Sequence, residues 1–262
     1  MKQALMLMGQ RSIDALQEFG YGVALSAEIM YWLLLGKLQK QSVRMDTVVV
    51  EAMQIGVNAI LIASLLCFAV GVMLAIQGIE TLKVFGAESQ VILGITLSVT
   101  REFSPLIVGI LVAGRSGSAI AARVGSMMES QEIDALRVMG INPVRFLAAP
   151  IFLAMLIMLP LLTVLGDLMG LLGGAVFTSL ELHMSLYAYA LRTLDIMSAD
   201  DLFQGLVKST VFAFLIAVVS LSNGFQARGG AEGIGRVTTR AVVMSISCII
   251  LADMMFTYLL NH

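Results

Sequence analysis

Long apolar runs separated by short polar segments make up most of the chain beyond residue 46. A helix needs about 20 consecutive apolar residues to cross a bilayer core of about 30 Å, and five of these runs are long enough. They cover about 52–79, 89–114, 146–180, 202–227 and 241–261. The pattern therefore predicts an all-α integral membrane protein with five transmembrane helices.

The N-terminal stretch before these runs has a different character. Its segment 19–37 is mostly apolar but is interrupted by Glu28 and carries three aromatic residues, Tyr21, Tyr31 and Trp32. A central acid and clustered aromatic side chains suit the headgroup boundary better than the hydrocarbon core. We therefore interpret 1–46 as a cytoplasmic or interfacial region with an amphipathic helix, and 47–262 as one five-span domain.

Lysine and arginine gather on one side of the predicted spans. The N-terminal region and the segments 115–145 and 228–240 hold most of them, whereas the opposite side has Lys83 and Arg192, with Lys208 near its edge. Cytoplasmic loops of membrane proteins are enriched in these residues. We therefore expect the N-terminus in the cytoplasm and the C-terminus on the outer side.

The composition agrees with a membrane protein and argues against an enzyme. Of the residues, 58% are hydrophobic and 13% are charged, with a mean hydropathy of +0.92, too little charge to cover a water-soluble domain. The sequence has no GxxxxGK[ST] phosphate loop and no GxSxG motif, and His183 and His262 lack companions at metal-ligand spacing. We expect neither nucleotide hydrolysis nor a metal site in this chain.

Adjacent charges, Arg101 and Glu102, interrupt the second apolar run. Ionisable groups within a membrane are costly and usually face protein or a water-filled cavity. Consecutive helical residues point about 100° apart, so each needs a partner elsewhere. The candidates on other spans are Lys208, Asp167 and Asp253. Two interpretations stay open: an ion-pair network that holds the helices in register, and a polar patch that meets a ligand headgroup or couples to conformational change.

The polar segment 115–145 contains a short acidic helix, predicted at about 126–139 and ended by Gly140. Apolar residues recur there at helical spacing at Ile133, Leu136 and Met139. The acidic residues Glu129, Glu132 and Asp134 occupy other positions of the helix. An amphipathic helix of this kind needs a surface to cover its apolar face. That surface is either a partner protein or the cytoplasmic end of its own helix bundle.

Several ordered motifs resemble those of the MlaE/YrbE permease family of ATP-binding cassette (ABC) transporters. The strongest stretch is TREFSPLIVGILVAGRSGSAIAARVGSMMESQEIDALRVMGINPVRFLAAP, and a second is KSTVFAFLIAVVSLSNGFQARGGAEGIGRVTTRAVV. Together the similarity covers about residues 50–260. Four positions depart from the usual family pattern: Phe103 replaces a leucine, Gln131-Glu132 reverses Glu-Gln, and Asn142 replaces an aspartate before Pro143.

The resemblance implies the permease half of a homodimer, with an interfacial helix, five spans and a cytoplasmic coupling helix. It implies two ABC ATPase subunits that hold the ATP and Mg²⁺, so that this chain binds no cofactor. A periplasmic lipid-binding ring protein is also implied, with a small cytoplasmic accessory subunit as a further candidate partner. No nucleic acid is expected. The implied location is the bacterial inner membrane, and the implied activity moves glycerophospholipids to or from a periplasmic carrier, which maintains outer-membrane lipid asymmetry.

The charge pattern and the family resemblance together indicate the candidate site residues. A substrate cavity for the lipid headgroup would hold Arg101, Glu102 and Lys208, with Asp167 and Asp253 as further intramembrane acids. Contact with the ATPase would involve six residues of the cytoplasmic segment, Met128, Glu129, Glu132, Asp134, Leu136 and Arg137. The alternatives are a permease for sterols or other hydrophobic molecules, an ion-coupled carrier or channel, and a scaffold for the other subunits.

Overall fold

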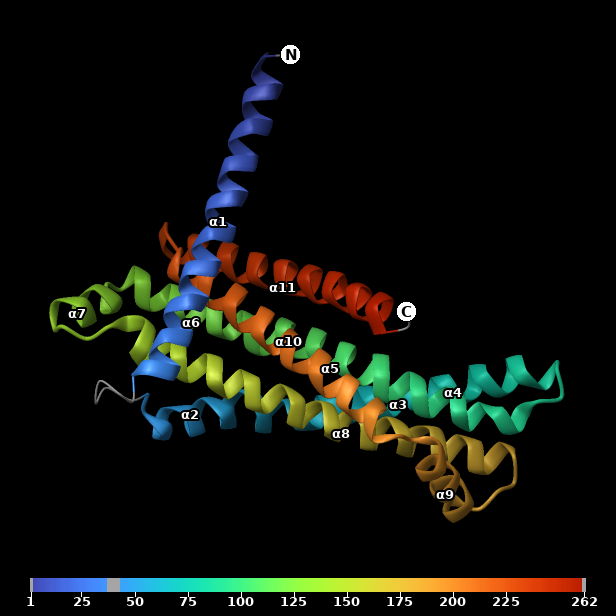
Figure 1. Cartoon of the computed structure of the whole chain (residues 1–262). Helices are drawn as coiled ribbons and strands as arrows, with labels where there is room; N and C mark the ends of the chain where they lie inside the picture. Colours follow the sequence, from blue (N-terminus) through green and yellow to red (C-terminus); the bar gives the residue numbers. More distant parts are fainter. Residues whose placement is uncertain (1, 37–42, 261–262) are drawn as a thin grey trace. The chain divides into compact units, whose positions relative to one another are not determined.

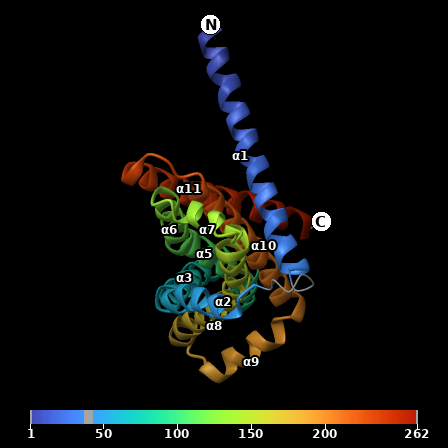
Figure 2. The same cartoon turned by 90° about the vertical axis from the view of Figure 1, so that its left-hand side faces the viewer.

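The computed structural model describes residues 2–36 and 43–260, and within these ranges it contains helices and turns but no strands. Figures 1 and 2 show the coiled ribbons from two sides. Five helical stretches are long and apolar enough to cross a membrane: Met45–Lys83, Glu88–Glu129, Val144–Glu181, Ala199–Phe225 and Gly230–Leu259. The prediction of an all-α membrane protein with five spans is confirmed.

The α-helices follow one another closely along the chain. They are α1 (Lys2–Leu35), α2 (Met45–Ala52), α3 (Asn58–Lys83), α4 (Val91–Ser98), α5 (Ser104–Val112), α6 (Ser118–Glu129), α7 (Glu132–Val138), α8 (Ala149–Glu181), α9 (Leu186–Ile196), α10 (Ala199–Phe225) and α11 (Gly230–Leu260). Wider π-helical turns link several of them without ending the helical path: Met53–Val57, Val99–Phe103, Ala113–Gly117 and Val144–Ala148. A 3₁₀ turn, Glu88–Gln90, precedes α4.

The π turn Val99–Phe103 is separated from Pro105 only by Ser104 and contains both predicted intramembrane charges. Proline has no N–H, so the carbonyl four residues before it loses its helical partner. Here the backbone N–H of Ser104 bonds to the carbonyl of Val99, five residues back. The chain absorbs the proline as a widened turn, a feature often found at functional sites.

The residues form two compact units, each described by itself below. The first unit contains Met1–Glu51, Gly117–Ala154 and Ile216–Ser245. Ala52–Ser116, Met155–Leu215 and Ile246–His262 form the second. Helices α8, α10 and α11 contribute residues to both units.

In the second unit, three glycines spaced four residues apart on α8 pack against the Glu88–Glu129 helix. A Cβ atom built at each would lie 2.6–2.8 Å from a side-chain atom of that helix, closer than real contacts allow. The facing pairs are Gly166 with Ser104, Gly170 with Val99 and Gly174 with Ile95. Small residues at this spacing let membrane helices approach closely, so the stripe on α8 is a packing surface.

The same helix also approaches α3 at backbone distance. A Cβ at Gly71 would collide with the carbonyl of Gly170, and a Cβ at Gly173 would collide with the carbonyl of Phe68. Glycine is therefore required on both sides of this contact. Close backbone approach of this kind increases van der Waals contact between helices, which drives their association in lipid.

The predicted coupling helix at 126–139 is wrong as a single helix. α6 ends at Glu129 and α7 begins at Glu132, and Gln131 between them has a left-handed backbone with φ of 60°. The Ser130 hydroxyl donates a hydrogen bond to Glu132 Oε1 at 2.7 Å, and such local side-chain bonds compete with continued helix. The predicted stop is confirmed, because Gly140 has φ of 75° and the Ile141 N–H bonds back to the Leu136 carbonyl.

The segment 228–240, predicted as a compact loop, is mostly helical. Positive φ is limited to Gly229 and Gly230, and α11 starts at Gly230. The Gly230 N–H donates to Glu129 Oε1 at 2.8 Å. A carboxylate at this position satisfies a free N–H of the first turn and interacts favourably with the helix dipole, which allows the helix to begin earlier than its glycines suggest.

Candidate functional site: a charge network and the segment around α7

Three helical stretches of the second unit bring the intramembrane charges together. Glu88–Glu129 supplies Arg101 and Glu102, α10 supplies Asp201 and Lys208, and α11 supplies Asp253 and Thr257. The polar side chains form two groups, one around Lys208 and one around Arg101. Both groups cross-link helices that are far apart in sequence.

Lys208 is the buried centre of the first group, with a relative exposure of 1%. Its Nζ lies 2.6 Å from Glu102 Oε2, 3.1 Å from Asp253 Oδ1 and 3.3 Å from Thr257 Oγ1. The ammonium group donates hydrogen bonds to Glu102 and Thr257 and forms an ion pair with Asp253. A buried charge requires such pairing, so Lys208 is held by these partners in the interior of the unit.

Arg101 pairs with Asp201 in the second group. Its Nε donates to Asp201 Oδ1 at 2.6 Å, and its Nη2 also pairs with that oxygen. Asp201 in turn accepts hydrogen bonds from the backbone N–H and the hydroxyl of Ser198, both at 2.9 Å. The arginine is thus attached to the first turn of α10.

Asp201 was missed as a partner because the sequence places it at the end of a polar loop. The feature of the sequence that could have identified Asp201 as a helical residue is the spacing Ser198-x-x-Asp201. The Asp201 N–H bonds to the Ser198 hydroxyl while Asp201 bonds back to the Ser198 N–H. This reciprocal arrangement is a capping box. It indicates a helix that begins at Ala199 and therefore an acid facing the membrane-spanning bundle.

The exposed parts of the network belong to the adjacent pair. The side chains of Arg101 and Glu102 are 37% and 35% exposed, whereas those of Asp201 and Lys208 are each 2% exposed. Arg101 and Asp201 balance each other, but Lys208 faces two carboxylates. The arrangement presents a cation and an anion side by side, each oriented by a buried partner of opposite charge.

Asp167 is not part of this network. No ion pair joins it to another residue in the described part of the chain. It is 5% exposed, and its Oδ1 atom has no hydrogen-bond partner there. The neighbouring Gly166 packs against Ser104 and Cys67. Asp167 therefore lies in the helix-packing region of α8 and not with the exposed charges.

The predicted ATPase-contact residues lie around the turn between α6 and α7, in the first unit. Glu129 caps α11, Glu132 accepts from Ser130, and Asp134 pairs with Arg137 at 3.0 Å on the exposed face of α7. Met128 and Leu136 are partly buried. Glu129, Glu132, Asp134 and Arg137 thus each contact another residue of this unit, which sequence spacing did not reveal.

The apolar face of α7 is split between a buried anchor and an exposed end. Ile133 is 0% exposed, whereas Val138 and Met139 are 89% and 64% exposed. Met139 was expected on the same covered face as Ile133. Instead it forms, with Val138, an exposed apolar pair at the tip of the segment.

A further ion pair in the first unit joins α2 to α6. Arg123 Nη2 lies 2.7 Å from Glu51 Oε2, and Glu51 is 6% exposed. Sequence analysis did not single out either residue, because the two are 72 positions apart. The pair attaches the start of the first membrane-spanning stretch to α6.

Comparison with known proteins connects this architecture to a family. A model of the family described as Permease MlaE matches residues 48–259. A probable ABC transporter permease protein of Rickettsia typhi is 31% identical over 254 residues, covering 97% of this chain and 96% of that protein. The chloroplastic protein TRIGALACTOSYLDIACYLGLYCEROL 1 of Arabidopsis thaliana is 38% identical over 190 residues, covering 70% of this chain and 53% of that protein.

A third relative carries a functional name. The intermembrane phospholipid transport system permease protein MlaE of Haemophilus influenzae is 29% identical over 251 residues, covering 95% of this chain and 94% of that protein. The match to the family covers all five helices that are able to span a membrane. The chain therefore belongs to the MlaE permease family, whose members here include probable ABC transporter permeases.

Proposed function

We propose that this protein is the transmembrane permease subunit of an ABC transporter that moves glycerophospholipids between the inner membrane and a periplasmic lipid carrier. Such transport would maintain the lipid asymmetry of the outer membrane. The observation that carries the proposal is the exposed Arg101–Glu102 pair inside a membrane-spanning helix, oriented by the buried Asp201 and Lys208. The name of the Haemophilus influenzae relative supports phospholipid as the substrate class.

The two cations of the network have different roles in this proposal. Arg101 keeps over a third of its side chain exposed, and a guanidinium group binds phosphate through several parallel N–H donors. Arg101 is therefore the residue that contacts a lipid phosphate. Lys208 is buried and already paired with Glu102 and Asp253, so it positions Glu102 and does not itself bind the headgroup.

ATP hydrolysis is assigned to separate ATPase subunits, which would hold ATP and Mg²⁺. The exposed Val138–Met139 pair, next to the predicted contact residues Leu136 and Arg137, is an apolar surface suited to a protein partner. Movement of the partner would act on α7 and on Glu129, which is bonded to the start of α11. The chain would thereby couple nucleotide-driven motion to its spans.

The proposed assembly is a homodimer with two ATPase subunits, a periplasmic lipid-binding ring protein and a small cytoplasmic accessory subunit. The protein would lie in the bacterial inner membrane with α1 at the cytoplasmic interface. Its N-terminus would be cytoplasmic and its C-terminus periplasmic, in agreement with the distribution of arginine and lysine. Five spans in one chain give no internal twofold symmetry, which a dimer would supply.

Reconstituted lipid transfer tests the proposal. The complex with its ATPase and ring protein would be placed in liposomes, and transfer of labelled phospholipid to the ring protein would be followed with ATP. Arg101→Ala should reduce transfer at least tenfold, because one charge-assisted phosphate contact contributes about 1.5–3 kcal/mol, whereas Arg192→Ala on the exposed surface of α9 should not. Unchanged transfer with Arg101→Ala would contradict the headgroup role. Copurified sterol in place of phospholipid, identified by mass spectrometry, would contradict the substrate class.

A further inference from the structure

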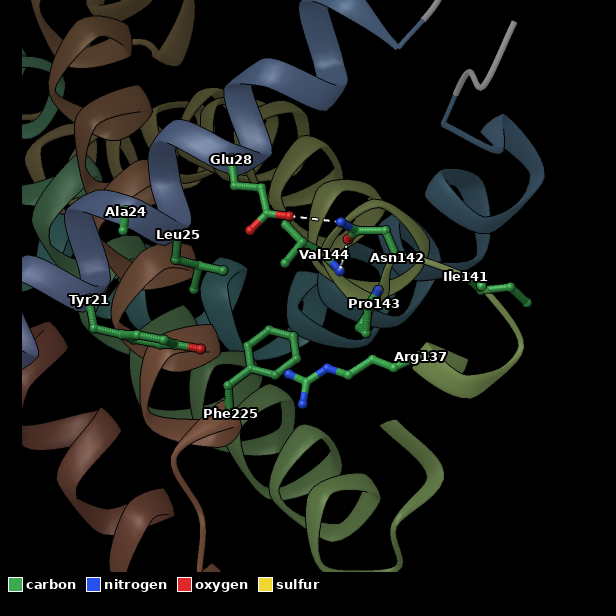
Figure 3. A pocket seen from close by; sticks show the side chains of 11 residues that line it. Tyr21, Ala24, Leu25, Glu28, Arg137, Ile141, Asn142, Pro143, Val144 and Phe225 are labelled. Carbon is green, nitrogen blue, oxygen red and sulfur yellow. Dashed lines mark hydrogen bonds between the residues drawn. The ribbon is translucent and has the colours of Figure 1, made fainter. Parts of the chain in front are cut away.

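A pocket of about 550 Å³ lies in the first unit, between α1 and the chain that leaves α7. Figure 3 shows its lining. Helix α1 contributes Tyr21, Leu25 and Glu28, the segment after α7 contributes residues around Asn142, and Arg137 and Phe225 complete the wall. The volume is within the range of about 300–1,000 Å³ that small-molecule sites occupy.

The acidic side of this pocket is fixed by a hydrogen-bond chain. Asn142 donates from Nδ2 to Glu28 Oε1 at 2.8 Å. The Oδ1 atom of Asn142 accepts from the backbone N–H groups of Val144 and Arg145, at 2.8 and 3.2 Å. The carboxylate of Glu28 is therefore held in one orientation, with its Oε2 atom left without a partner among the described residues.

The basic side of the pocket also keeps unused donors. Arg137 pairs with Asp134 through Nη1 alone, so its other guanidinium N–H groups have no partner in the part of the chain that the structure describes. Tyr21 and Arg137 both extend toward Phe225 in Figure 3. No hydrogen bond from the Tyr21 hydroxyl is present among the described residues, so a cation and a hydroxyl donor face the same space.

The charges of the pocket act on Tyr21. Burial raises the pKa of its hydroxyl above the usual value, the Arg137 charge lowers that pKa and the Glu28 charge raises it. Both charged groups are thus close enough to influence the hydroxyl. Because the net shift is upward, Tyr21 stays protonated at neutral pH and remains a donor.

The surroundings of the pocket favour a lipid as the source of its ligand. Tyr31 and Trp32, further along α1, form an edge-to-face pair with ring centroids 5.4 Å apart, and Arg145 lies 5.3 Å from the Trp32 ring. Tyrosine and tryptophan gather at the level of lipid headgroups. Large apolar residues of α1 are exposed on the chain, among them Leu16, Phe19, Val23 and Leu34. They form a surface on which acyl chains can lie.

We propose that this pocket binds the phosphoethanolamine headgroup of a membrane phospholipid. Arg137 and Tyr21 donate hydrogen bonds to the phosphate, and Glu28 Oε2 accepts one from the primary ammonium group. Phosphatidylcholine, whose ammonium has no N–H, cannot make the bond to Glu28, and phosphatidylglycerol has no ammonium group. The site is formed by other residues than the Arg101 network and goes beyond the proposed transport, because lipid can bind here whether or not the protein moves it.

Native mass spectrometry of the full chain, released from nanodiscs of equal phosphatidylethanolamine, phosphatidylcholine and phosphatidylglycerol, tests the site. Phosphatidylethanolamine should be retained at least fivefold over each of the other lipids. Glu28→Gln keeps the acceptor for Asn142 but removes the charge, so it should abolish the preference over phosphatidylglycerol. Tyr21→Phe and Arg137→Gln should lower retention of both phosphatidylethanolamine and phosphatidylglycerol, because both variants remove a donor to the phosphate. Glu18→Gln on α1, outside the pocket, and Arg192→Gln should leave the ratios unchanged.

Several outcomes would overturn the site. Equal retention of the three lipids by the wild-type chain would do so, as would an unaltered ratio in Glu28→Gln protein whose melting temperature matches wild type. Full displacement of the retained lipid by micromolar soluble O-phosphoethanolamine would assign the pocket to a soluble ligand. Loss of ATPase copurification in the pocket variants with unchanged lipid ratios would make it a protein contact. None of these measurements depends on lipid transport. The lipid site can therefore fail while the proposed transport function holds, and the transport function can fail while the lipid site holds.

Discussion

Asn142 donates a hydrogen bond to Glu28 across 2.8 Å and at the same time caps the backbone of the helical stretch that starts at Val144. One amide therefore joins α1 to the beginning of a membrane-spanning helix. Only an asparagine provides both a donor and an acceptor in this geometry, since an ionised aspartate is an acceptor alone. An aspartate at position 142 could cap the same backbone but could not donate to Glu28.

The first prediction concerns this pair. Asn142→Asp should keep the backbone cap but place two carboxylates in contact, and lower the free energy of unfolding by about 1–3 kcal/mol. Adding Glu28→Gln supplies a new amide donor and should restore the loss. Thermal unfolding of the four proteins in detergent forms a double-mutant cycle. Additive effects of the two changes would show that the residues do not interact.

Lys208 provides the second prediction. Lys208→Met removes the buried cation that pairs with Glu102 and Asp253, and leaves the carboxylates of these two residues close together without it. Removing one partner of a buried ion pair typically costs about 3–5 kcal/mol, so the melting temperature should fall strongly. Glu102→Gln with Asp253→Asn in the same protein should recover most of the loss. A melting temperature that stays low in the triple variant would mean that Lys208 acts through packing instead of charge.

The glycine contact between α3 and α8 gives the third prediction. A Cβ at Gly71 would collide with the Gly170 carbonyl, so Gly71→Ala must push the helices apart and should cost about 1–3 kcal/mol, as overpacked cores do. Gly94→Ala is the matched control, because no atom lies within 4 Å of its Cβ position. Alanine favours helix over glycine by about 1 kcal/mol, so this control should be neutral or stabilising. Equal melting temperatures for the two variants would contradict the packing.

Hydropathy predicted the spans because each one must satisfy its backbone internally and present apolar side chains to lipid. The same reasoning named Lys208, Asp167 and Asp253 as candidate partners of Arg101 and Glu102 without assigning pairs. Lys208 pairs with Glu102 and with Asp253, whereas no ion pair of Asp167 is present among the described residues. This reasoning missed Asp201, because the capping box makes the first turn of α10 polar. Hydropathy then assigns this turn to the preceding loop instead of to the membrane-spanning helix. Arg101 and Asp201 are 100 positions apart, so no spacing within either helix indicates that they pair.

The boundaries of α6, α7 and α11 were harder to predict for a related reason. The helix breaks at Gln131 although no glycine or proline is present there. The left-handed backbone of Gln131 is accompanied by the hydrogen bond from Ser130 to Glu132. The early start of α11 depends on Glu129, a residue 101 positions away. In both places a side-chain contact, and not backbone propensity, decides where the helix begins or ends.

The last prediction addresses the exposed tip of α7. Val138→Ser combined with Met139→Ser removes apolar surface that is 89% and 64% exposed in the chain, so the melting temperature of the isolated protein should change little. If an ATPase subunit covers this tip, the double variant should weaken copurification of that subunit about tenfold or more, since burying two such side chains contributes about 1.5–3 kcal/mol each. Leu194→Ser, an exposed apolar residue on α9, is the control and should leave the complex intact. Undiminished copurification of the double variant would show that the ATPase binds elsewhere, because no other role in the described structure requires these two side chains to be apolar.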